Sequence, residues 1–278
     1  MTNRTLQLPE PREDTTTSIG RANVTAGAAL LVMAVISGFA YLIAVKGLVT
    51  PGNAVKTAKD ISAHESLFRI GYLALFFVAA LDVIVAWVLF RVFAPVNRRL
   101  SAVGAWLRTG YAGVFIVAIS RLTSVLSLLS PRASGAGAST SQLREQVLHR
   151  INSFTEIWNV GLILFGVYLL TLAYLAYRSS FVPGLVSALL AIAGCAYLFD
   201  SFTALTIRAT DTPLSTISAA GELMFALWLV TRGHRITRRS ASDHNGSIVA
   251  AREERRTTAS HQSPISTTPF SPSLTTSK

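Results

Sequence analysis

Six ionisable residues lie inside long apolar stretches of this chain, and they are the residues best placed to carry chemistry. They are Asp82, Arg108, Arg121, Glu156, Asp200 and Glu222. A charged side chain at the centre of a membrane-spanning helix costs about 2.5–3.5 kcal/mol, so it usually faces a partner or a water-filled cavity. Carboxylates in such a place can carry protons or cations, and arginines can pair with them. We therefore take these six as the candidate functional residues.

Six apolar segments carry these charges. They cover residues 24–45, 70–93, 102–129, 154–177, 181–207 and 214–230. About 20 apolar residues in a helix are enough to cross a bilayer. The sequence therefore predicts an all-α fold, a polytopic membrane bundle of six transmembrane helices over residues 24–231. Residues 1–23 form a polar N-terminal segment, and residues 232–278 form a basic, Ser/Thr-rich tail that we expect to be disordered because it lacks apolar periodicity.

The composition agrees with a membrane protein. Of the 278 residues, 51% are hydrophobic and only 14% are charged, which is too apolar for a soluble domain of this size. The net charge of +11 comes from basic residues between the apolar segments and in the tail, so we expect a lipid bilayer as partner and no nucleic acid. With Cys195 as the single cysteine and no metal-ligand spacing or catalytic motif, we expect no metal, no cofactor and no enzyme activity.

An even number of spans places both termini on one side of the membrane. Basic residues are more numerous on that side, which favours cytoplasmic termini. Residues 94–97 and 180–183 are short, proline-containing links. Because proline cannot continue a helix cleanly, we expect tight turns there between antiparallel neighbours.

The first loop on the opposite side opens with the turn-forming sequence TPGN. Ala54, Ala58 and Ile61 then recur at helical spacing, which predicts a short helix in this loop. Ser62 followed by Glu65 resembles a capping box. This pattern predicts that the second long helix starts at Ser62, before the membrane.

The other long loop, residues 131–141, is rich in Ser, Gly and Ala. After it, Leu143, Val147, Ile151 and Phe154 form an apolar stripe. The stripe has two interpretations. It could lie on the membrane surface, or it could extend the fourth spanning helix outward, and we favour the extension.

The depth of each charge along its helix predicts which charges can meet. At 1.5 Å per residue, Asp82, Arg108 and Glu222 lie about 16, 10 and 14 Å from the inner ends of their helices. An arginine side chain can bridge such offsets. We therefore predict an inner cluster of these three residues.

The remaining charges lie nearer the outer surface. On the same scale, Arg121 and Asp200 are about 12 and 10 Å from the outer ends of their helices, and Asn159 and Glu156 are nearer still to that surface. We predict an outer cluster here. Because Arg108 and Arg121 point about 220° apart around one helix, two separate ion-pair sites are favoured over one continuous pore.

The charges do not balance within the apolar segments, since four acids face two arginines. Two acids would lack a basic partner, and burial favours their neutral form. Asp82 and Glu222 lie deepest and are the best candidates to take up a proton. Structural glue between helices is our favoured account of the arginine pairs, with a proton or cation pathway through Asp82 or Glu222 as the alternative.

Small residues four apart indicate where helices could pack closely. Ala34 with Gly38, and Gly184 with Ala188, have this spacing. Small side chains let two membrane helices approach, so we expect close packing at both places.

Several strings of the sequence, in order, resemble a family of bacterial multi-spanning membrane proteins known as domain of unknown function 4386. They are AHESLFRIG at 63–71, DV at 82–83, APVNRRL at 94–100, NVGLILFG at 159–166, YRS at 177–179, YLFDSF at 197–202, GEL at 221–223, LWLV at 227–230 and RG at 232–233. The resemblance implies a membrane fold, a bacterial inner membrane and no known activity. The family often has Asp where this chain has Asn159 and a His near Tyr168, so the resemblance argues against a metal enzyme here.

We therefore predict an integral membrane protein, and three classes of role remain open. The favoured one is a small proton-coupled transporter or permease-like protein that uses Asp82 or Glu222. The second is a membrane-embedded sensor or interaction subunit without transport activity. The third, an intramembrane enzyme, is the least favoured because no catalytic motif is present.

Overall fold

The computed structural model describes residues 14–130, 139–179, 182–207 and 221–231, and the regular elements of these residues are helices, with no strand among them. The chain divides into two units, Met1–Ile236 and Thr237–Lys278. The second unit, with the tail predicted to be disordered, lies outside the described residues, as do residues 1–13. The all-α prediction is confirmed.

The described helices follow the predicted apolar segments. They are α1 Asp14–Gly38, η1 Phe39–Val45, η2 Lys46–Leu48, α2 Ala54–Ala63, α3 Glu65–Phe93, α4 Arg98–Leu128, α6 Thr140–Arg178, α7 Gly184–Ile207 and an unlabelled helix, Gly221–Thr231. Five stretches are long and apolar enough to span a membrane: Ala26–Leu48, Glu65–Phe93, Arg98–Leu128, Thr140–Arg178 and Gly184–Thr206. Gly221–Thr231 is a shorter apolar helix, and the start of the predicted sixth span, residues 214–220, lies outside the described residues. The chain is thus a polytopic membrane bundle.

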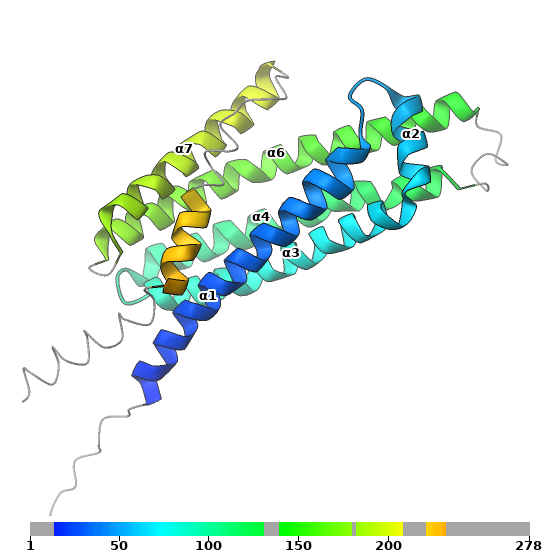
Figure 1. The fold of residues 1–278 in the computed structure, drawn as a ribbon. Coiled ribbons are helices and arrows are strands. Elements are labelled where there is room, and N and C mark those ends of the chain that lie inside the picture. Colours follow the sequence, from blue (N-terminus) through cyan, green and yellow to red (C-terminus); the bar gives the residue numbers. More distant parts are fainter. Residues whose placement is uncertain (1–13, 131–138, 180–181, 208–220, 232–278) are drawn as a thin grey trace, which may run out of the picture. The chain divides into compact units, whose positions relative to one another are not determined.

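The long helices of the first unit pack in a row of neighbours. α6 packs most extensively against α4 and α7, α4 also packs against α3, and α3 packs against α1 and η1 (Figure 1). Helix α6 therefore lies between α4 and α7. This order decides which charged side chains can meet.

The prediction that the apolar stripe extends the helix of the fourth span is confirmed. Helix α6 runs without a break for 39 residues, which is about 58 Å at 1.5 Å per residue, whereas the hydrocarbon core is about 30 Å thick. Leu143, Val147, Ile151 and Phe154 are all buried. Helix α2 packs against α6 (Figure 1), and it buries Ala58 and Ile61. The apolar stripe of α6 is thus covered by protein, which explains why it does not need a membrane surface.

The predicted capping box at Ser62 is wrong. Ser62 lies inside α2, whose first turn is capped by the side chain of Asn53, which accepts a hydrogen bond from the backbone N–H of Lys56. Helix α3 begins afresh at Glu65, which pairs with Arg69 one turn later. The chain turns before α2 at Gly52, whose φ of 72° suits glycine. The turn at Gly52 and the cap at Asn53 start α2 before Ser62. Ser62 is therefore inside a helix and cannot cap the start of the next one.

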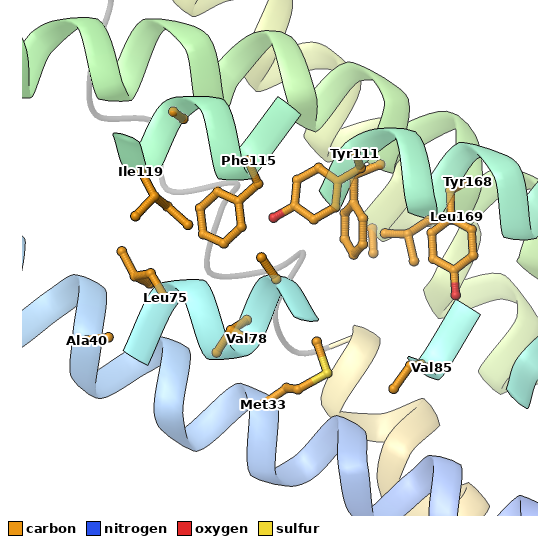
Figure 2. Packing of buried hydrophobic residues seen from close by; sticks show 14 of the residues in the cluster. Met33, Ala40, Leu75, Val78, Val85, Tyr111, Phe115, Ile119, Tyr168 and Leu169 are labelled. Atoms are coloured by element: carbon orange, nitrogen blue, oxygen red, sulfur yellow. The ribbon is translucent and has the colours of Figure 1, made fainter. Parts of the chain in front are cut away.

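The bundle core is apolar and aromatic. Figure 2 shows Phe115 and Ile119 of α4 facing Leu75 and Val78 of α3. All four side chains are buried. Met33 of α1 joins the same cluster from the other side of α3. This apolar packing surrounds the charged residues described below.

Close helix packing occurs at glycines other than the predicted ones. A Cβ added to Gly194 of α7 would lie 2.9 Å from the carbonyl oxygen of Gly166 on α6, so the two backbones cross at these glycines. By contrast, a Cβ on Gly38 or Gly184 would meet nothing within 4 Å among the described residues. The small-residue spacing predicted close contacts at Gly38 and Gly184, and neither residue faces a neighbouring helix in the described part of the chain.

Substituting Gly194 with alanine should destabilise the bundle. The added methyl group would overlap the α6 backbone, and overpacking of this kind costs about 1–3 kcal/mol. Thermal unfolding of the purified full chain in detergent should show a lower midpoint. Gly113→Ala is the matched control, since a Cβ there meets nothing within 4 Å. Equal midpoints for the two variants would contradict the crossing.

Candidate functional site: a buried arginine cluster

Arg108 of α4 lies at the centre of the candidate site. Its side chain is 3% exposed. Its Nη2 donates to Oδ1 of Asp82 on α3 at 2.6 Å, and its Nη1 donates to the hydroxyl of Tyr168 on α6 at 2.9 Å. The guanidinium carbon also lies 5.6 Å from the ring centroid of Phe165 and 5.1 Å from that of Tyr168. One side chain thus ties three long helices together.

The contacts of Arg108 offset the cost of burying its charge. Removing an ion from water costs several kcal/mol even in a relaxed protein, and a partner repays this only with good geometry and further hydrogen bonds. Asp82, 4% exposed, supplies the opposite charge at short range. The aromatic faces of Phe165 and Tyr168 add cation–π attraction, worth about 2 kcal/mol or more where water is excluded. These contacts therefore allow the Arg108–Asp82 pair to be buried in the core.

Glu222 is the second carboxylate at this site. It is half-buried, and its Oε1 accepts a hydrogen bond from the hydroxyl of Tyr197 on α7 at 2.9 Å. A small cavity of about 10 Å³ is lined by both Arg108 and Glu222. The structure thus brings together all three residues of the predicted inner cluster, Asp82 by a direct ion pair and Glu222 across a shared cavity.

The cluster has an unbalanced charge. Asp82 and Glu222 are two acids, whereas Arg108 is the one base among the residues described at the site. Buried charges need compensation, and a group that lacks it takes its neutral form. The cluster therefore has one more acid than base, and a proton on one carboxylate would balance its charge.

The predicted outer cluster is not formed among the described residues. Arg121 makes no ion pair there, and its buried Nε has no hydrogen-bond partner in the described part of the chain. Glu156 is exposed, and Asn159 and Asp200 are half-buried. Arg121 belongs to α4 and Asp200 to α7, and α6 packs between these two helices. Depth along the helices matched, but the order of the helices keeps the two residues apart.

Three tyrosines of the site were not singled out from the sequence. Tyr168 and Tyr197 bind Arg108 and Glu222, and the hydroxyl of Tyr111 accepts a hydrogen bond from Nε1 of Trp158 at 3.2 Å. Tyr111 follows Arg108 by three positions, so helical spacing could have placed it on the same face. Nothing in the sequence marks Tyr168 or Tyr197 as partners, because tyrosine is also common at membrane interfaces.

These tyrosines belong to a connected cluster of aromatic rings. Trp158 contacts Tyr41 and Phe115, with ring centroids 4.6 and 5.3 Å apart. Tyr111 and Phe165, 4.7 Å apart, extend the cluster to the arginine. The rings thus link Tyr41 of η1 to the Arg108 site.

No group of three or more His, Cys, Asp or Glu residues in the described part of the chain could hold a metal ion. The polar groups brought together at the site are two carboxylates, one guanidinium and phenolic hydroxyls. Such groups bind and pass protons and form ion pairs.

The whole site lies in a region of the chain that matches a family model. A family model described as "Domain of unknown function (DUF4386)" matches residues 25–233. A protein of Archaeoglobus fulgidus, described as uncharacterized, is 27% identical over 163 residues, which cover 59% of this chain and 83% of that relative. No solved structure matches the chain. The matched region contains every residue of the arginine cluster.

Removing one partner of the buried pair should destabilise the protein strongly. Asp82→Ala removes the carboxylate that is hydrogen-bonded to the buried Arg108, and breaking such a pair typically costs about 3–5 kcal/mol. Unfolding of the full chain in mixed micelles measures the loss. Glu65→Ala is the control, because it removes an exposed pair on the same helix and should cost less than about 0.5 kcal/mol.

The double variant Asp82→Leu/Arg108→Met sharpens this test. Replacing both charges with apolar groups is often close to neutral for stability. The double variant should therefore be more stable than Asp82→Ala. If Asp82→Ala is no worse than Glu65→Ala, the pair does not support the core in the way described.

Proposed function

The chain belongs to the family described as domain of unknown function DUF4386, and because that description assigns no activity, we propose a function from the geometry of the site: a small proton-coupled transporter in which Glu222 carries the proton. The chain is an integral membrane protein with several apolar helices. Coupling to protons needs a carboxylate inside the bundle that can change its charge.

The unbalanced charge around Arg108 is the observation that carries this proposal. Asp82 is held by a charge-assisted hydrogen bond of 2.6 Å, so its negative charge is already matched. Glu222 accepts a hydrogen bond only from the neutral hydroxyl of Tyr197 among the described residues. The excess negative charge of the cluster therefore belongs to Glu222, which is the group that can gain or lose a proton.

A proton on Glu222 would change how the helices attract one another. With the proton bound, the cluster of two acids and one arginine is neutral and suits an apolar core. Without it, Glu222 and Asp82 compete for Arg108 across the cavity that Glu222 and Arg108 share. A ligand or proton shifts a conformational equilibrium only by binding its two states differently. The competition for Arg108 supplies that difference between the helix of Glu222 and α4.

A sensor or interaction subunit is the second candidate, and the length of α6 favours it. This helix of 39 residues exceeds the hydrocarbon core by roughly 28 Å. Together with α2 it forms a packed layer outside the spans, which offers a surface to a protein partner. In this case the arginine cluster would hold the helices together without passing protons.

We also propose that both termini are cytoplasmic, in the inner membrane if the source is bacterial. The support comes from arginines at the two ends of the chain, such as Arg4, Arg12, Arg235 and Arg238, since positive loops stay inside. A phosphatase reporter fused after Lys278 should be inactive and a fluorescent protein fused there should be bright. Reporters after Gly52, in an outer loop, should behave oppositely. Two reporters with equal behaviour would contradict this orientation.

Proton flux into sealed proteoliposomes tests the transport proposal. Under an imposed membrane potential, the full chain should pass protons, and Glu222→Gln should reduce the flux to that of protein-free vesicles because the amide cannot ionise. Tyr197→Phe should lower the rate of proton flux without abolishing it, since it removes only a hydrogen-bond donor to Glu222. Folding of each variant is checked by size-exclusion chromatography and thermal unfolding.

Glu156→Gln is the matched control for this measurement. Glu156 is also a glutamate of an apolar segment, but it is exposed and lies about 18 Å along α6 from Tyr168. Its flux should equal that of the unmodified chain. If folded Glu222→Gln passes protons at the normal rate, transport through Glu222 is contradicted. If the unmodified chain passes no protons, the sensor or interaction candidate is favoured.

A further inference from the structure

One nitrogen of Arg108 makes none of the hydrogen bonds described so far. The two terminal nitrogens bind Tyr168 and Asp82. The third nitrogen, Nε, is buried, and its N–H meets no hydrogen-bond acceptor among the described residues. An unpaired buried donor costs about 1–3 kcal/mol, and buried polar groups in native proteins are nearly always paired with protein or ordered water. An acceptor is therefore expected beside Arg108.

The cavity that Arg108 shares with Glu222 provides room for that acceptor. Its volume of about 10 Å³ is at the lower limit for one water molecule, about 10–15 Å³. Its polar lining comes from Arg108, Tyr168 and Glu222. The other lining residues are apolar: Leu30, Leu169, Leu172, Leu190 and Phe225. A single small molecule with polar partners on one side fits this description.

The charges around the cavity select the class of that molecule. A metal cation would be repelled by the guanidinium of Arg108, which is held in place by two hydrogen bonds. An anion would be repelled by Asp82 and, when ionised, by Glu222. An organic solute is far larger than the space. A neutral molecule that both accepts and donates hydrogen bonds satisfies each of these limits.

We propose that this cavity binds one water molecule, which accepts a hydrogen bond from Nε of Arg108 and donates one to the carboxylate of Glu222. The water gives each of the three nitrogens of Arg108 a hydrogen-bond partner and gives Glu222 a second partner beside Tyr197. It joins Asp82, Arg108, Glu222 and Tyr197 into one hydrogen-bonded chain across α3, α4, Gly221–Thr231 and α7. This site stands on the unused donor and the cavity, and it does not depend on transport.

The water also gives a physical link between the two carboxylates. A water can reverse its role and accept a hydrogen bond from Glu222 when that residue carries a proton, so the chain persists in both charge states. Bridging waters are nearly as favourable in enthalpy as direct hydrogen bonds. A change of charge at Glu222 is then felt at the Asp82–Arg108 pair without movement of either helix.

A crystal structure of the full chain grown from lipid, at a resolution that shows ordered waters, tests the site directly. We expect a density peak within about 3.2 Å of both Arg108 Nε and a carboxylate oxygen of Glu222. Glu222→Gln keeps an acceptor of the same size and should keep the peak. Glu222→Leu removes the acceptor and should lose the peak while the Asp82–Arg108 pair remains.

Infrared spectra of the same proteins give an independent reading in solution. A buried water with weak hydrogen bonds has a stretching band that shifts in ¹⁸O water, and this band should be present in the unmodified chain and in Glu222→Gln but absent from Glu222→Leu. A direct bond between Arg108 Nε and Glu222, an empty cavity, or a band that survives in folded Glu222→Leu would overturn the proposal. Because neither measurement involves flux, failure here is distinct from failure of the transport proposal.

Discussion

The bundle is organised around one buried guanidinium, that of Arg108. A cation in an apolar core is tolerable only when its hydrogen bonds and its charge are met locally, and here a carboxylate of α3 and a hydroxyl of α6 meet both needs at 2.6 and 2.9 Å. These two contacts fix the registers of α3 and α6 against α4. The favoured account of such pairs as glue between spans therefore fits Asp82 and Arg108. That account does not explain Glu222, because an ion pair that only holds helices together does not need a second carboxylate.

Close approach of the helices brings these polar groups within reach of one another. Gly161 of α6 faces Tyr111 and Val114 of α4, where an added Cβ would lie 3.1 Å from the nearest side-chain atom. The crossing of Gly166 and Gly194 does the same for α6 and α7. In a membrane, where apolar burial between helices gains little, small residues of this kind permit the van der Waals packing that drives association. The glycines thus place α6 close enough to both neighbours for Tyr168 and Tyr197 to reach their partners.

Much of this could be predicted from the sequence, and the limits have physical causes. Hydropathy located the spans because each is long and apolar, and depth along a helix placed Asp82, Arg108 and Glu222 at one level. Depth says nothing about which helices are neighbours, so Arg121 and Asp200 were grouped although α6 lies between α4 and α7. Small-residue spacing likewise does not say which face of a helix meets another. The tyrosine partners were missed because the sequence does not show whether a tyrosine hydroxyl binds a buried charge or a lipid headgroup.

The partners of the two carboxylates also show why one of them is the better carrier of a proton. The bond from Arg108 to Asp82 is strong because both groups are charged, and a proton on Asp82 would remove that assistance. The bond from Tyr197 to Glu222 comes from a neutral hydroxyl, which can donate to an ionised carboxylate and equally to the carbonyl oxygen of a protonated one. Glu222 can therefore change its charge without losing its partner. Protonation would thus weaken the bond of Asp82 but not the bond of Glu222, and this difference is the main support for the proposal that the cluster does more than hold helices together.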